Sequence, residues 1–536
     1  MRGADLLAQT LKAAGTSRIF SLSGNQIMPV YDACFELGIE IVHTRHEAAA
    51  VFMAEAHAQL TGEVGVALVT AGGGLSNAVG PLFPVGESET PVLLLSGDSP
   101  AGQDGRGAFQ EMSQCAVTAP LTKLSVRPLK ASDIGHETAR AIRTARSGRP
   151  GPVHIALPFD VVEADAGTTA VPPASAFERV PQWLGHADVK RIAQSIAAAQ
   201  RPVVICGPVM NRTRSGDLTE RLAAALDVPV IVMESPRGLR DPSLGEIGKV
   251  LAQADLIVSL GKRIDFTLAF GGGNAFRADV NWIVVDAKLS EFDRASLNLG
   301  SKLKTVASAN PVDAARQLAD LGKAGNAQDH AKWRSEVAER LAVRNTSGAG
   351  DSGGTITSAQ LCEAVQRQIK AASGSVAISD GGEIGQWAQA LTAANHRVIN
   401  GVSGVIGGGL CYGLAAALAK PDHKVFAMMG DGTVGFHFGE VETAARHGAA
   451  YVIVIGNDMR WNAEHQIQLR DYGPNRLIGC QLSDARYDLA VAGLGGHGEY
   501  VTRLDELDAA LSRAVASGKV ACVNVMIDGA PAPAGH

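Results

Sequence analysis

Short, continuous apolar runs alternate with segments of helical periodicity along almost the whole chain, and this alternation restricts the fold more than any other feature. Strands that are apolar on both faces need cover on both faces, which parallel sheets flanked by helices provide. We therefore predict an α/β protein with three doubly wound parallel sheets. The runs fall into three groups: residues 66–70, 92–96 and 153–157; residues 203–206, 230–233, 256–259 and 282–285; and residues 376–379, 425–429, 451–455 and 522–527.

Two segments of different composition separate these groups. Residues 164–177 are rich in Ala, Thr and Pro, and residues 323–358 place a helical insert between polar stretches, so both are interpreted as linkers. A chain of 536 residues is also too long for one hydrophobic core and agrees with about three domains. The predicted domains cover residues 1–165, 180–325 and 355–530.

Charge and composition argue against several classes of protein. The formal net charge of −6 gives no basis for a nucleic-acid partner. The sequence has no apolar stretch of 18 residues, and residues 1–15 have the pattern of an amphipathic helix, so we expect neither a membrane span nor a signal peptide. The seven cysteines form no CxxC pair, which argues against a zinc site or a disulfide framework and favours the cytoplasm.

Polar side chains follow two of the apolar runs in the third group. Gly430-Asp431-Gly432 comes directly after residues 425–429, and Gly456-Asn457 follows the next run. The 26 residues from Asp431 to Asn457 are the length of one helix plus one strand, so both side chains are expected at the same carboxyl edge of a parallel sheet. A carboxylate and an amide oxygen suit Mg²⁺, and glycine-rich turns with free N–H groups suit a diphosphate. A GDG tripeptide on its own is more often an ordinary turn.

Glu47 is the second candidate for chemistry. It follows an apolar run and begins a helix of small residues, which leads to another strand and a glycine-rich turn. A carboxyl group in apolar surroundings has a raised pKa and can share a proton with a ligand. The alternative is a solvated residue at a helix start, attracted by the helix dipole.

Together these segments resemble the thiamine-diphosphate (ThDP) dependent enzymes of the acetolactate-synthase-like family. The GDG-to-Asn spacing is similar to the metal motif of that family, and the stretch of residues 45–74 is similar to its RHE, small-residue helix and glycine-rich turn. The likeness extends over nearly the whole chain, through residues 23–33, 107–123, 149–161 and 402–419.

The resemblance implies roles for individual residues. The side chains of Asp431 and Asn457 and the main-chain oxygen of Met459 would bind Mg²⁺. Glu47 would hydrogen-bond the cofactor pyrimidine and promote the tautomer that removes the thiazolium C2 proton. Gln110 is a second catalytic candidate because it matches the substrate entrance of acetolactate synthases, as do Phe109 and Lys123; ordinary interdomain packing is the alternative for these three.

Further residues would contact the cofactor. Leu410 would wedge between its two rings, for which a plain core leucine is the alternative, and the Gly408 carbonyl would accept from the 4′-amino group. The other contacts that the resemblance implies are Gly24, Gly73, Gly382, Glu383, Gly430, Gly432, Thr433 and Asn457. The sequence departs from the family at three of its motif positions: Gly456 replaces an asparagine, Glu383 a glutamine and Ile384 a histidine.

The central part of the chain leaves a nucleotide ligand open. Residues 261–276, with the single Asp265, are more similar to the oxalyl-CoA decarboxylase and 2-hydroxyacyl-CoA lyase branch, in which this domain can hold an ADP-like moiety. Asp286 ends the next strand, where an acid can bind a ribose hydroxyl. FAD or an ADP-like nucleotide is therefore an alternative here, but a central domain without ligand is favoured.

The resemblance implies C–C bond cleavage or formation on a small 2-oxo acid, by decarboxylation with or without addition to a second carbonyl. It also implies a homo-oligomer, a dimer or a tetramer, whose cofactors lie between the first domain of one subunit and the third domain of another. Two alternatives stay open: a 2-hydroxyacyl-CoA lyase or oxalyl-CoA decarboxylase-like enzyme, and a ThDP-binding relative without turnover.

Overall fold

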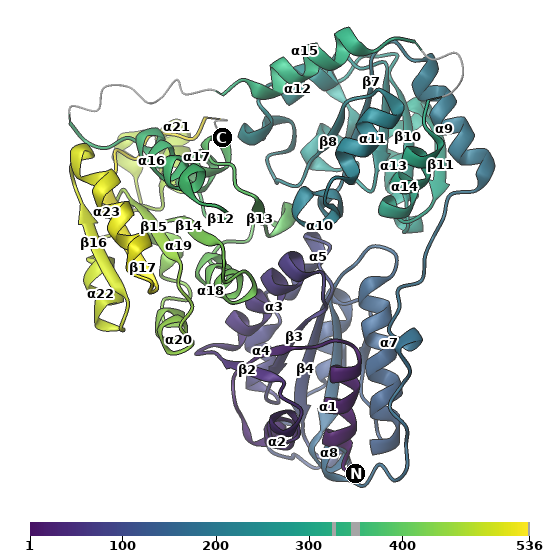
Figure 1. Ribbon diagram of the computed structural model, residues 1–536, viewed down its shortest axis with the longest axis vertical. Helices are drawn as coiled ribbons and strands as arrows, with labels where there is room; N and C mark the ends of the chain where they lie inside the picture. Colours follow the sequence, from purple (N-terminus) through teal and green to yellow (C-terminus); the bar gives the residue numbers. More distant parts are fainter. Residues whose placement is uncertain (324–327, 345–353, 534–536) are drawn as a thin grey trace.

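The computed structural model of this protein describes residues 1–323, 328–344 and 354–533. It contains three parallel sheets, each flanked by helices, which confirms the predicted α/β class (Figure 1). The three sheets follow one another along the chain, so each belongs to its own domain. Among the described residues, no helix is long and apolar enough to cross a membrane.

The N-terminal domain has six strands in the order β2-β1-β3-β4-β6-β5. These are β1 (Arg18–Ser21), β2 (Glu40–His43), β3 (Gly65–Val69), β4 (Val92–Asp98), β5 (Ser125–Val126) and β6 (Val153–Pro158). Its helices are α1 (Gly3–Ala13), α2 (Met28–Glu36), α3 (Glu47–Thr61), α4 (Gly73–Ala78), α5 (Leu82–Glu87), α6 (Gln114–Thr118), α7 (Ile134–Arg146) and α8 (Phe159–Glu163).

The central domain has five strands in the order β11-β10-β9-β7-β8. These are β7 (Pro202–Cys206), β8 (Val230–Val232), β9 (Leu256–Leu260), β10 (Asn281–Asp286) and β11 (Leu303–Ser308). Its helices are α9 (His186–Ala198), α10 (Arg212–Ser215), α11 (Leu218–Leu226), α12 (Ile247–Leu251), α13 (Leu289–Leu299), α14 (Pro311–Leu321) and α15 (Ala331–Ala342).

The C-terminal domain has six strands in the order β13-β12-β14-β15-β17-β16. These are β12 (Ser375–Asp380), β13 (His396–Val398), β14 (Lys424–Gly430), β15 (Val452–Asn457), β16 (His497–Val501) and β17 (Ala521–Met526). Its helices are α16 (Ser358–Ala371), α17 (Glu383–Leu391), α18 (Gly409–Ala419), α19 (Asp431–Val434), α20 (Glu440–Arg446), α21 (Asn462–Tyr472), α22 (Tyr487–Gly493) and α23 (Leu504–Ala516).

Every apolar run singled out in the sequence lies on a strand, to within one or two residues at each end. The predicted linker at residues 164–177 carries no strand or α-helix, and the helical insert of the second linker is α15. Residues 324–327 and 345–353 of that second linker lie outside the described part of the chain.

Two buried helices of small residues join the first and third domains. Helix α3 and helix α18 share one hydrophobic core, which includes Phe52 of the former and Leu414 of the latter. Alanine and glycine let the two helix backbones approach closely, and Figure 1 shows α3 and α18 next to each other where the two domains meet. A hydrogen bond also holds the segment just before α3 against the C-terminal domain: the Arg45 backbone N–H donates to Glu440 at 2.9 Å.

Candidate cofactor and metal site

The register of two neighbouring strands brings the predicted metal ligands to one edge of the C-terminal sheet. Strands β14 and β15 are parallel, and Gly430 pairs with Gly456. Asp431 and Asn457 are the residues that follow these two glycines, so both side chains leave the sheet at its carboxyl edge. The geometry inferred from their spacing is therefore present.

Asp431 is buried and lacks a partner for one carboxylate oxygen. Its Oδ2 accepts no hydrogen bond from any described residue, and the residue is 2% exposed. Burial raises the pKa of the Asp431 carboxyl to about 6, although backbone N–H groups of Asp431, Arg460 and Gly432 act in the opposite direction. An orphaned buried carboxylate oxygen is costly unless a cation binds it, so Asp431 fits the predicted magnesium ligand.

The amide of Asn457 is held in a fixed orientation. Its Nδ2 donates to Asn524 Oδ1 at 3.2 Å, and its Oδ1 accepts from the Met459 backbone N–H at 3.1 Å. Met459 has a φ of +59°, which is rare for a side chain of this kind and is typical of a backbone fixed for function. Asn457 and Met459 thus have the local geometry expected of the second and third ligands, but their binding of Mg²⁺ stays a prediction.

A cavity of about 250 Å³ lies between this sheet edge and the central domain. Six of the predicted cofactor and metal residues line it: Gly382, Glu383, Gly430, Asp431, Gly432 and Thr433. An added Cβ at Gly432 would lie 2.7 Å from the Trp461 ring, so only glycine fits this turn. The cavity also has an orphaned acceptor at its wall, because Gln386 Oε1 is buried without a partner among the described residues.

These residues fit a magnesium diphosphate. Hard oxygen donors from Asp431, Asn457 and the Met459 backbone leave positions for phosphate oxygens and water, as Mg²⁺ prefers. Within the described ranges no group of three His, Cys, Asp or Glu side chains could hold a metal ion by itself, so an ion at Asp431 would need these mixed ligands.

Four charged residues of the cavity wall were not predicted from the sequence. They are Arg237 of the central domain and Asp458, Arg460 and Glu464 of the C-terminal domain. Burial raises the pKa of Asp458 to about 7, and the negative charge of Asp431 adds to the effect. Asp458 could have been predicted by treating every polar residue that follows a strand as a site candidate. No sequence signal, in contrast, indicates that the Arg237 loop lies at the sheet edge of another domain.

The N-terminal candidates form a second cluster. Glu47 is the first residue of α3 and is 8% exposed, so its interpretation as a solvated residue is wrong. Its Oε2 accepts from Asn77 Nδ2 at 3.0 Å, and Gly73 begins α4, the helix that contains Asn77. A Cβ added to Gly74 would lie 3.5 Å from Glu47 Oε1, which places the glycine-rich turn beside the carboxylate.

Gln110 and Gly24 are tied to the same turn. Gln110 Oε1 accepts from Gln26 Nε2 at 2.8 Å, and Gln26 Oε1 accepts from the Thr70 hydroxyl at 2.6 Å. Gly24 lies against Thr70, where a Cβ would come within 2.3 Å. Gln110 also has a positive φ, +60°, like Met459. Two predicted site residues thus adopt a conformation that is found at only six non-glycine residues in the described part of the chain.

The other two matches to the substrate entrance differ from Gln110. Phe109 is 76% exposed, and the Lys123 ammonium donates to the backbone carbonyls of Thr144 and Ser147 at the end of α7. Lys123 therefore caps a helix in this structure, while Phe109 is free to meet a ligand or a partner surface.

Gly408 and Leu410 stand at the start of α18 and do not line the cavity. Leu410 is 2% exposed within the core that α3 and α18 share, as its interpretation as a core leucine requires. Asp380, at the end of β12, fixes this helix start: its carboxylate accepts from the Gly407 and Gly409 N–H groups, the latter at 2.8 Å. The role of Leu410 between cofactor rings stays a prediction.

The cavity at the C-terminal sheet edge does not include the N-terminal cluster. The residues that line the cavity come from the central and C-terminal domains alone, and neither Glu47 nor Gln110 is among them. The meeting of Glu47 with a cofactor held at Asp431, between two subunits, stays a prediction.

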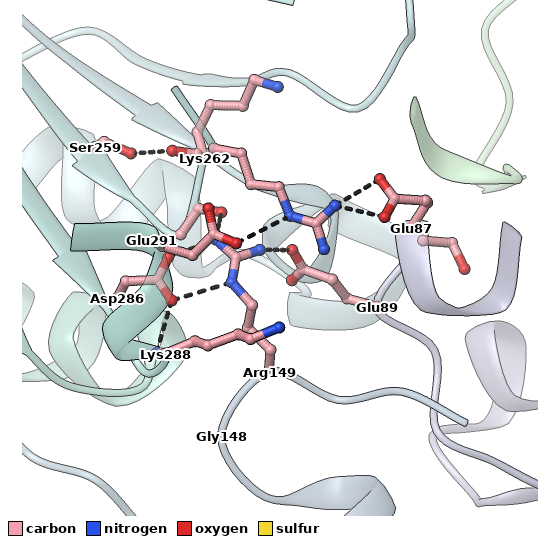
Figure 2. Close-up of polar contacts among 12 residues, drawn as sticks. Glu87, Glu89, Gly148, Arg149, Ser259, Lys262, Asp286, Lys288 and Glu291 are labelled. Carbon is pink, nitrogen blue, oxygen red and sulfur yellow. Dashed lines mark hydrogen bonds and ion pairs between the residues drawn. The ribbon is translucent and has the colours of Figure 1, made fainter. Parts of the chain in front are cut away.

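The acid that was considered for a nucleotide ribose in the central domain is engaged by the N-terminal domain. Arg149 Nε donates to Asp286 Oδ1 at 3.0 Å, its Nη2 donates to Asp286 Oδ2 and to the Gly261 carbonyl, and its Nη1 donates to Glu89 (Figure 2). Asp265 instead begins the turn after β9, where its carboxylate accepts from the Thr267 N–H at 3.0 Å. Both acids thus have hydrogen-bond partners within the protein.

Comparisons with known proteins agree with this architecture. Three family models match: the N-terminal TPP-binding domain of thiamine pyrophosphate enzymes over residues 1–117, the central domain over 189–309 and the C-terminal TPP-binding domain over 380–525. Acetolactate synthase large subunit IlvG of Mycobacterium tuberculosis is 31% identical, covering 98% of this chain and 96% of that protein. 2-Hydroxyacyl-CoA lyase 2 of Danio rerio is 29% identical, covering 98% and 91%. 2-Hydroxyacyl-CoA lyase of Arabidopsis thaliana is 26% identical, covering 98% and 95%.

Three parallel-sheet domains with two TPP-binding family matches define the class of thiamine-diphosphate-binding folds. The chain belongs to the family of thiamine pyrophosphate enzymes. Its relatives include both acetolactate synthases and 2-hydroxyacyl-CoA lyases, the two branches that its sequence resembles.

Proposed function

We propose that this enzyme uses ThDP and Mg²⁺ to cleave or form a C–C bond beside the carbonyl of a small 2-oxo acid. The observation that carries the proposal is that Asp431 and Asn457 lie at one sheet edge, with an unpartnered Asp431 oxygen at a cavity of about 250 Å³. The similarity to acetolactate synthases over nearly the whole chain supports the 2-oxo acid as substrate.

The residues of the chain would divide the work. Asp431, Asn457 and the Met459 carbonyl would hold Mg²⁺, and the glycine turns at Gly382 and Gly432 would let the backbone approach the diphosphate. Glu47 would hold or release a proton at the pyrimidine N1′ of a cofactor bound across the subunit interface, and its buried position supports that role. ThDP, when bound, supplies the nucleophilic carbon and stores the electron pair of the broken bond.

A second candidate, a 2-hydroxyacyl-CoA lyase, is favoured by the relatives of that name. Asp286 does not support the lyase candidate, because its carboxylate is already paired with Arg149. An ADP-like moiety would have to displace Arg149 to bind there. We therefore place the 2-oxo acid reaction first and expect neither FAD nor an ADP-like nucleotide in the central domain.

One experiment separates these candidates. Native mass spectrometry of the purified protein identifies bound ThDP, nucleotide and the oligomeric state, which we expect to be a dimer or a tetramer. Assays with pyruvate and with a 2-hydroxyacyl-CoA thioester, each with Mg²⁺ and ThDP, then identify the substrate class. CO₂ release from the 2-oxo acid supports the proposal; turnover of the thioester alone favours the second candidate, and cofactor binding without any turnover indicates a non-catalytic relative.

A further inference from the structure

Arg237 belongs to the central domain but lines the cavity at the edge of the C-terminal sheet. It lies in the loop that follows β8, together with Ser235 and Pro236 of the same cavity wall. The loop is held in place on both sides of Arg237. Ser235 Oγ accepts from the Arg237 N–H at 3.2 Å and donates to Gln389 at 3.4 Å, while Gly238, with a φ of +51°, packs so closely on Thr267 that a Cβ would meet its carbonyl at 1.9 Å.

The guanidinium of Arg237 is half-buried and lacks the partners that such a group needs. It donates no hydrogen bond to any described residue, whereas Arg149 and Arg263 in the same structure are engaged with carboxylates. Burial lowers the pKa of Arg237, and the charge of Glu383 partly offsets this. A partly desolvated guanidinium with five free donors is costly by itself and favourable beside an anion.

The cavity wall carries mixed charges: four acids, Glu383, Asp431, Asp458 and Glu464, and two arginines, Arg237 and Arg460. Asp431 and Asp458 mark one region, where a divalent cation would neutralise them, and Arg460 acts electrostatically on both. Arg237 is in another part of the wall, near Glu383 at the start of α17. An anion that bridges from the cation to Arg237 would thus have positive charge at both ends.

We propose that Arg237 binds the terminal phosphate of the magnesium-bound diphosphate, so that the central domain contributes directly to the cofactor site. The inference rests on the proposed ThDP and Mg²⁺ function and extends it to a residue of a domain that the family models do not describe as TPP-binding. Its consequence is that cofactor binding ties the central and C-terminal domains together.

The test measures binding of Mg²⁺·ThDP and of Mg²⁺·pyrophosphate to the full-length apoprotein by isothermal titration calorimetry. We expect Arg237→Met to weaken both about 10- to 100-fold, since a charge-assisted pair is lost, and Arg237→Lys to weaken them less. Arg240→Met, an exposed arginine of the same loop that does not line the cavity, is the matched control and should leave both affinities unchanged. Thermal unfolding of the apoproteins checks that each variant is folded.

A double variant separates phosphate binding from simple neutralisation of Glu383. If Arg237 only offsets that carboxylate, Arg237→Met combined with Glu383→Gln will regain the affinity of the Glu383→Gln protein; if Arg237 binds the phosphate, the loss will persist.

A loss below fivefold in Arg237→Met, an equal loss in Arg240→Met, or regained affinity in the double variant overturns the inference. So does unchanged cofactor affinity with a raised KM for the 2-oxo acid, which would assign Arg237 to the substrate carboxylate. Failure of the wild-type protein to bind Mg²⁺·ThDP would instead refute the proposed function itself.

Discussion

Asp431 and Asn457 follow directly paired glycines of two neighbouring parallel strands, although 26 residues of chain separate them. The connection consists of α19, α20 and β15, which returns the chain to the same sheet edge. This relationship explains why a spacing in the sequence can predict that two side chains lie at the same sheet edge: helix and strand lengths set the distance along the chain, and strand register sets the distance in space.

Asp431→Asn should abolish tight magnesium binding and, in the apoprotein, raise stability. The loss of the charged oxygen should weaken Mg²⁺ about 100-fold or more. The Asp431 pKa is raised to about 6 from 3.8, so the stability that its protonated form contributes is complete below pH 3.8 and is lost as the pH rises through 6. At pH 8 without metal, the asparagine variant should therefore be more stable by about 2 kcal/mol.

Urea denaturation at pH 8 with EDTA and magnesium titration with ThDP provide the two measurements. Asp422→Asn, an exposed aspartate just before β14, is the control and should change neither. A variant that binds Mg²⁺·ThDP as tightly as the wild-type protein would remove Asp431 from the ligand set.

Glu47→Gln should leave ThDP bound but slow its activation. The glutamine can still accept from Asn77 but cannot exchange a proton with the pyrimidine, so proton exchange at C2 of bound ThDP should fall by about 10²- to 10⁴-fold. Hydrogen–deuterium exchange followed by acid quench and NMR measures this rate. Glu36→Gln, an exposed residue at the end of α2, should exchange normally.

The same variant tests whether two subunits share a site. Co-expressed Glu47→Gln and Asp431→Asn chains should form mixed dimers in which one site keeps both intact residues, and random assembly would return about a quarter of wild-type activity. Complete inactivity of isolated mixed dimers would mean that Glu47 and Asp431 of one chain serve the same cofactor.

The strands show which parts of the fold the sequence can reveal. The predicted runs omit the edge strands β2, β5, β11, β13 and β16, although they include the edge strand β8. They also omit β1, a central strand of only four residues. An edge strand has one neighbour and more contact with solvent, so its sequence lacks a continuous apolar run; β11, for example, buries only Ala307. Central strands are covered on both faces, and their composition records that burial.

The candidate site residues were likewise predictable only where the sequence near them carries the pattern. Asp431 and Glu47 follow strands of their own domains and Asn457 ends one, so the local sequence pattern was enough to predict them. Arg237 and Arg149 act on other domains, and their partners depend on how whole domains pack. No periodicity or spacing carries that information.

Arg149→Met should destabilise the contact between the N-terminal and central domains. Arg149 is buried between Glu89 and Asp286, and its removal leaves two buried carboxylates without a cation. Such losses cost about 3–5 kcal/mol. Chemical denaturation measures the change, and Arg140→Met, which removes an exposed pair with Glu137, should cost less than about 1 kcal/mol. A double variant with Asp286→Asn should lose less than Arg149→Met alone; a larger loss would contradict this account.

Glu55 makes the junction of α3 and α18 sensitive to pH. It is completely buried, its Oε1 accepts from Ser88 Oγ at 2.5 Å, and its Oε2 accepts from the Tyr412 hydroxyl at 2.7 Å. Burial raises the Glu55 pKa from 4.5 to about 7 despite these hydrogen bonds. The stability that its protonated form contributes is therefore complete below pH 4.5 and is lost as the pH rises through 7, by up to about 3 kcal/mol.

Glu55→Gln replaces the acid by a neutral group of the same shape and should remove this part of the pH dependence. The free energy of unfolding of the apoprotein, measured in urea at pH 5 and pH 8, should fall less in the variant, which should also be the more stable protein at pH 8. Glu36→Gln should retain the wild-type difference because that side chain is exposed. If Glu55→Gln shows the same fall as the wild-type protein, Glu55 is ionised at both pH values. Its hydrogen bonds to Ser88 and Tyr412 then outweigh the cost of burying its charge.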